Sequence, residues 1–155
     1  MDEQKKKKIY VAVIVISTVI IGAVASLFII KLIRKVSFND ALSNVTKAVK
    51  TGFPGANRIE TSGHTVYITV WVEGMFDASK LAATGNEKAF KSWNELRDNM
   101  YLTVFDICDR FTLVDDAKVY FYLVSEKNTD NELLVFENRS IIYDGVYEYI
   151  SRNGG

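Results

Sequence analysis

The chain has 155 residues, of which 19 are basic and 19 acidic, so its formal net charge at neutral pH is zero. This balance hides two unlike parts: seven basic and two acidic residues give positions 1–35 a charge of +5, whereas twelve basic and seventeen acidic residues give positions 36–155 a charge of −5. An acidic domain repels phosphate backbones, so the composition argues against a nucleic-acid partner.

The longest apolar stretch, residues 9–30, predicts a single transmembrane helix. It contains no charged residue, and at about 1.5 Å per helical residue it matches the roughly 30 Å hydrocarbon core of a bilayer. Residues 1–8 then form a basic leader and residues 31–36 a juxtamembrane segment, where bases suit anionic lipid headgroups. Ala23-Val24-Ala25 resembles a signal-peptide cleavage site, but the apolar pattern continues beyond it, which favours an uncleaved signal anchor.

The basic residues on either side of the span predict its orientation. Four lysines at positions 5–8 precede it, and three bases follow it: Lys31, Arg34 and Lys35. The positive-inside bias places the N-terminus in the cytoplasm and the C-terminal domain outside the cell membrane.

One face of the predicted span carries small residues at every fourth position: Thr18, Gly22 and Ser26. Small side chains at this spacing allow two helices to approach closely, although such patterns also arise by chance in apolar helices. Association of two copies through the membrane is therefore an open hypothesis.

The first half of the C-terminal domain predicts a helix and a hairpin. The helix begins at Ser37, with Asp40 as a capping-box partner, and ends at Gly52. Residues 59–61 and 64–73 are predicted to pair around Ser62-Gly63, and the second strand has one aliphatic face: Val66, Ile68, Val70 and Val72. Residues 74–86 have few large apolar side chains and are predicted to be a long loop.

The second half of the domain predicts a long helix and further strands. The helix covers residues 87–111, opened by Thr84 with Glu87 in capping-box spacing. Its apolar stripe is Trp93, Leu96, Met100, Val104, Ile107 and Phe111. Strands are predicted at 118–126, 133–136 and 141–143. The tail from Val146 is either an edge strand or a last helical turn.

These elements define the α+β class, in the order α-β-β-α-β-β with one more strand as an alternative. Hairpins favour antiparallel pairing, and helices with one apolar stripe pack on one face of a sheet. We therefore expect residues 37–155 to form one domain, in which two helices cover an antiparallel sheet.

Aromatic residues on the two clearest strands are the strongest indication of a site. Four of them project from the face opposite the aliphatic one: Tyr67, Trp71, Tyr120 and Tyr122. Tyrosine and tryptophan on an outward face suit contact with a protein partner. The alternative is a second core face, covered by a helix or by the tyrosines of the C-terminal tail.

Motifs of enzymes and cofactor sites are absent from the sequence. It contains no nucleophile elbow, P-loop or dinucleotide fingerprint, so we expect no catalytic residue and no cofactor. The only histidine, His64, adjoins a predicted turn, and the only cysteine, Cys108, falls in an apolar helical pattern typical of a buried side chain. Acidic pairs leave a weaker hypothesis of a metal site or hydrolase: Asp106 with Asp109, and Asp115 with Asp116.

Three functions follow from these patterns. The first is a non-enzymatic, membrane-anchored subunit whose outer domain contacts another membrane or envelope protein. The second rests on a resemblance of outline to type IV pilin-like subunits, in which an apolar helix also leads into an antiparallel sheet. The resemblance implies a structural role in a pilus or in a secretion or conjugation machine. However, Ile9 directly follows Lys8, without the glycine that this family places before its mature helix. The third is a small hydrolase with an acidic site.

The predicted orientation can be tested by cysteine labelling. With Ser125→Cys in a Cys108→Ala background, an impermeant thiol reagent should label intact cells, because the domain lies outside. Protection of the cysteine until the cells are lysed would contradict the orientation.

Overall fold

The computed structural model describes residues 37–153, which contain four helices and five strands. The elements are α2 (Phe38–Gly52), β1 (Asn57–Ser62), β2 (Thr65–Trp71), α3 (Met75–Ala83), α4 (Glu87–Arg110), β3 (Lys118–Val124), β4 (Glu132–Glu137), β5 (Ser140–Asp144) and α5 (Gly145–Asn153). No helix within this range is long and apolar enough to span a bilayer. The predicted span 9–30, with Thr18, Gly22 and Ser26, lies outside the described residues.

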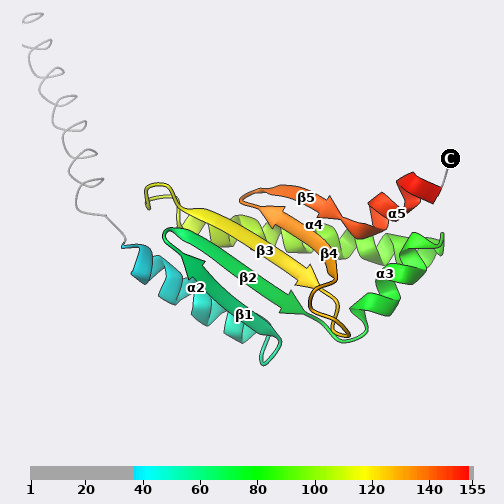
Figure 1. Ribbon diagram of the computed structural model, residues 1–155, viewed down its shortest axis with the longest axis horizontal. Coiled ribbons are helices and arrows are strands. Elements are labelled where there is room, and N and C mark those ends of the chain that lie inside the picture. Colours follow the sequence, from blue (N-terminus) through cyan, green and yellow to red (C-terminus); the bar gives the residue numbers. More distant parts are fainter. Residues whose placement is uncertain (1–36, 154–155) are drawn as a thin grey trace, which may run out of the picture. The chain divides into compact units, whose positions relative to one another are not determined.

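The five strands form one mixed sheet in the order β1-β2-β3-β4-β5 (Figure 1). The α+β class is therefore confirmed, but the prediction of a purely antiparallel sheet is wrong, because β2 and β3 are parallel. The other three neighbouring pairs are antiparallel. A parallel pair needs a crossover, and α3 and α4 provide it between β2 and β3.

Helices α2 and α4 lie behind the sheet in Figure 1 and cover one of its faces. The α2 N-cap is as predicted: the Ser37 side chain accepts from the Asp40 backbone N–H, and the Ser37 hydroxyl donates to the Asp40 carboxylate at 2.7 Å. The sheet contributes alternate residues to the same core: Val66, Ile68, Val70, Val119, Phe121, Leu123, Leu134 and Phe136. The predicted arrangement of two helices on one face of the sheet is thus correct for α2 and α4.

Two further helices replace a predicted loop and an undecided tail. Within residues 74–86, α3 starts after Gly74, whose φ of 79° suits glycine, and it has no side-chain cap. Its buried residues are the small Ser79 and Ala82, so the segment lacks the large apolar stripe that identifies a helix from sequence. The C-terminal tail forms the helix α5, which contacts α3. Of the two alternatives for the tail, the helix is therefore correct and the edge strand is wrong.

The starts of α4 and α5 use caps that the sequence did not predict. The N-cap of α4 is Asn86, whose side chain accepts from the Ala89 N–H at 2.9 Å, whereas the Thr84 hydroxyl donates back to Lys80 at the end of α3. No cap was predicted for α5; it is Asp144, whose carboxylate accepts from the N–H groups of Val146 and Tyr147.

The environment of Ser125 changes the design of the orientation test. This residue is fully buried, and its hydroxyl accepts from the Lys127 N–H at 3.1 Å. A cysteine there would be shielded by the fold whichever way the chain is inserted. Thr129 is exposed in the loop between β3 and β4, so Thr129→Cys is the suitable labelling position.

Core substitutions test the arrangement of α4 and β2. The Trp93 side chain is 2% exposed and Val70 is fully buried. Trp93→Ala should lower the free energy of unfolding by about 3–5 kcal/mol, because it leaves a cavity. Val70→Asp should prevent folding, because it buries a charge without a partner.

Thermal and denaturant unfolding of the full-length variants, followed by circular dichroism, gives the measurement. Ser43→Ala on the exposed side of α2 is the control and should melt like the parent protein. Parental melting of Trp93→Ala or Val70→Asp would contradict the core described above.

Candidate binding face

The four aromatic residues predicted as a contact surface lie on the face of the sheet opposite α2 and α4. Tyr67 and Trp71 come from β2, Tyr120 and Tyr122 come from β3, and all four are half-buried. None belongs to the hydrophobic core cluster, which takes the alternate residues of the same strands. We call this surface, defined by these four residues, the aromatic face.

Strand register arranges the residues around the aromatic face in rows across the sheet. The first row runs over four strands as Glu60, Tyr67, Tyr120 and Glu137. The Tyr67 and Tyr120 rings stack with centroids 5.4 Å apart and planes 10° apart. The Tyr120 hydroxyl donates to Glu137 Oε1 at 2.9 Å. Two stacked tyrosines are thus flanked by a carboxylate on each side.

Two further rows extend this surface. The second row is Arg58, Thr69, Tyr122, Val135 and Tyr143, and the third is Trp71, Val124 and Glu132. The Tyr122 ring lies 6.4 Å from the Tyr120 ring in a stacked arrangement, so three tyrosines form a continuous series. Trp71 lies at the end of β2, outside this series.

Two valines in the rows of the aromatic residues are buried, although they lie outside the core cluster. Val124 and Val135 are each 2% exposed, and yet neither belongs to the core cluster on the helical face. Both lie in rows with the large rings, so the face opposite α2 and α4 combines two buried valines with four half-buried aromatic residues.

The surroundings of Tyr120 and Tyr122 raise the pKa of both hydroxyls. The hydrogen bond to Glu137 is the main reason why the pKa of Tyr120 is raised above its ordinary value. Burial, followed by the charge of Glu132, raises the pKa of Tyr122. A tyrosine is neutral at pH 7 even with its ordinary pKa, so both hydroxyls are available there for hydrogen bonds with a ligand.

Of the C-terminal tyrosines, Tyr147 packs against α4, whereas Tyr149 lines a small pocket with Tyr143 and Glu132. The Tyr147 hydroxyl donates to Asn94 of α4 at 2.9 Å, and its ring lies 5.5 Å from that of Phe90. Helix α5 contacts α3, β4 and β5. Within residues 37–153, helices α2 and α4 occupy the other face of the sheet.

The acidic residues considered for a hydrolase or metal site are not brought together. Asp106 forms an ion pair with Arg110 at 2.9 Å, and Asp109 forms one with Arg139. Asp115 and Asp116 are exposed in the loop before β3. Across the described range, no group of three or more acidic, histidine or cysteine side chains has the arrangement of a metal site.

The single histidine and the single cysteine have structural surroundings. His64 is exposed, its Nδ1 lies 3.1 Å from the Asp115 carbonyl oxygen, and its ring stacks on Phe38 at 5.1 Å. Cys108 is buried as predicted, and burial raises the pKa of its thiol to about 11. A thiol with this pKa is protonated at neutral pH and therefore a poor nucleophile.

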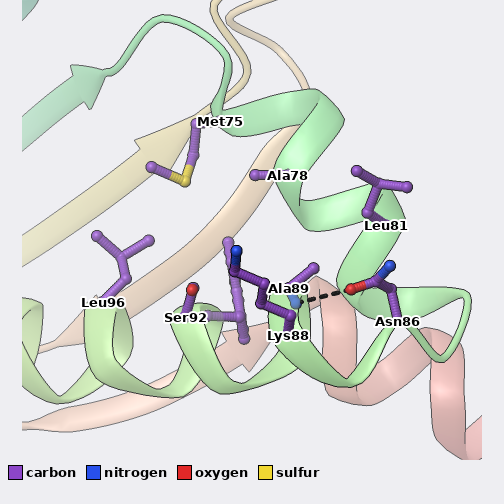
Figure 2. A pocket seen from close by; sticks show the side chains of 9 residues that line it. Met75, Ala78, Leu81, Asn86, Lys88, Ala89, Ser92 and Leu96 are labelled. Atoms are coloured by element: carbon purple, nitrogen blue, oxygen red, sulfur yellow. Dashed lines mark hydrogen bonds between the residues drawn. The ribbon is translucent and has the colours of Figure 1, made fainter.

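A groove between α3 and α4 is the feature that sequence reasoning missed (Figure 2). Its volume is about 380 Å³, and its lining is mainly apolar: Met75, Ala78, Leu81, Asn86, Lys88, Ala89, Ser92, Trp93 and Leu96. One wall is α3, which was predicted to be a loop. With a loop predicted in place of α3, no second wall was expected opposite α4, and so no groove was predicted.

Comparison with protein-family models, curated proteins and solved structures finds no match to this chain.

The bond between Tyr120 and Glu137 can be tested by titration. Because the carboxylate accepts the hydroxyl proton and so favours neutral tyrosine, Glu137→Gln should lower the pKa of Tyr120 toward its ordinary value. NMR titration of the tyrosine ring carbons measures this pKa, with Tyr120→Phe identifying the resonance. An unchanged pKa in Glu137→Gln would show that the bond does not form in solution.

Proposed function

We propose that the protein is a non-enzymatic, membrane-anchored subunit whose α+β domain lies outside the cell and binds another membrane or envelope protein through the aromatic face. The observation that carries this proposal is the series of three stacked tyrosines, with Trp71 beside it, on a sheet face separate from the core.

The chemistry of the aromatic face supports a protein partner. Tyrosine and tryptophan rings offer large apolar area together with polar groups that remain wet, and they are enriched among residues that dominate binding energy. Ring stacking and the hydrogen bond from Tyr120 to Glu137 restrain the tyrosine rings. Less conformational entropy is then lost when a partner binds.

The membrane anchor in this proposal comes from the sequence. The apolar stretch 9–30 precedes the domain, and the bases at positions 5–8 favour a cytoplasmic N-terminus. The pilin-like alternative requires processing of the leader before polymerisation. Mass spectrometry of the mature N-terminus separates the two proposals, because an intact leader contradicts processing.

The hydrolase alternative has weaker support than the binding function. Both helical carboxylates considered for it, Asp106 and Asp109, are engaged by arginine side chains. Activity screens with substrates of hydrolases would test it directly.

Trp71→Ala tests the aromatic face. Because the Trp71 ring is half-buried, its loss should destabilise the domain by less than the loss of the buried Trp93. Partner capture should be abolished, because a large aromatic anchor is removed from the contact. The partner is first identified by a photo-reactive amino acid placed at Tyr67 in living cells, with the same amino acid at Ser43 on the opposite face as a control.

Melting curves and capture of the identified partner are then measured together. Tyr101→Ala removes an exposed aromatic side chain from α4 and should leave capture unchanged. The proposal fails if Trp71→Ala lowers the melting temperature as much as Trp93→Ala does, or if the variant still captures the partner at the parental level.

A further inference from the structure

The groove between α3 and α4 is formed by two helices of the crossover, away from the aromatic face. Figure 2 shows Met75, Ala78 and Leu81 along α3, with Ala89, Ser92 and Leu96 on the facing turns of α4. Leu81 is 54% exposed, so it forms an open rim. An apolar groove of about 380 Å³ is at the lower end of the range for small-molecule sites, roughly 300–1,000 Å³.

One wall of the groove is held rigidly by the core. The Trp93 side chain lines it and is 2% exposed. The indole Nε1–H of Trp93 donates to Asp144 Oδ1 at 3.1 Å, which fixes the ring from β5. The groove is therefore preformed, and a ligand would not need to order this wall.

The polar groups of the lining are matched to an anion. The Asn86 side-chain oxygen is already engaged by the Ala89 N–H, as the dashed line in Figure 2 shows. The indole N–H of Trp93 is engaged by Asp144. Two further side chains of the lining can donate: the ammonium of Lys88 and the hydroxyl of Ser92. Lys88 is the only charged residue of the lining, so the site has a charge of +1 and no carboxylate.

We propose that this groove binds a single-chain carboxylate amphiphile, such as a free fatty acid. The carboxylate pairs with the Lys88 ammonium and accepts a hydrogen bond from Ser92. The hydrocarbon chain lies against Met75, Leu81 and Leu96. The volume suits one short chain, whereas a peptide helix or a two-chain lipid would need a larger groove.

Calorimetric titration with octanoate tests the proposal on the full-length chain in lipid nanodiscs, with empty nanodiscs as the blank. Octanoate should bind saturably and more tightly than octylammonium, which has the same chain length and the opposite charge. Lys88→Glu should weaken octanoate binding by about threefold to tenfold, because it removes the charged donor and adds repulsion. The same variant should bind octylammonium more tightly than octanoate.

Two further variants distinguish binding in the groove from a general effect of charge on α4. Lys91→Glu makes the same change of charge on α4 at an exposed position that does not line the groove, and it should keep the parental preference. Ala78→Phe fills the groove from α3 and should abolish binding of both probes.

The absence of saturable octanoate binding overturns the proposal. The proposal is also overturned if Lys88→Glu still prefers octanoate to octylammonium as the parent protein does. Binding of octanoate by Ala78→Phe at the parental level would overturn it as well. Loss of partner capture in Ala78→Phe, in the absence of octanoate binding by the parent protein, would assign the groove to a protein contact instead.

Discussion

The parallel pairing of β2 with β3 is the constraint on which the rest of the domain depends. It lies at the centre of the sheet, and its crossover contains both α3 and α4. The crossover helix α4 joins α2 on one face and supplies more buried core residues than any other helix within residues 37–153. The same pairing puts Tyr67 directly beside Tyr120, so one feature of topology creates both the covered face and the aromatic face.

Residue patterns predicted the parts of the fold that have a strong period. The alternation in β2 and β3 correctly separated Val70 and Phe121 in the core from Tyr67 and Tyr120 on the other face. The long stripe of α4 correctly identified Trp93 as a core residue. These predictions succeeded because large side chains repeat at the spacing of their element.

Local pattern could not reveal the direction of strand pairing or the helix α3. A strand with alternating residues looks the same whether its neighbour is parallel or antiparallel, so β2 and β3 gave no sign of their relation. Helix α3 packs through Ser79 and Ala82, whose small side chains allow a close approach but contribute little to hydrophobic periodicity. The groove between α3 and α4 could not be predicted either, because α3 itself was not recognised as a helix.

The apolar groove and the C-terminal helix share a single support. Asp144 ends β5, accepts from the indole of Trp93, lies 3.9 Å from Arg97, and accepts from the first N–H groups of α5. One carboxylate therefore connects α4 with β5 and α5, and Trp93 and Asp144 are 51 residues apart along the chain. Residues 140–153 and the wall of the groove are thus expected to open as one cooperative unit in hydrogen exchange, so that occupancy of the groove and protection of α5 are thermodynamically linked.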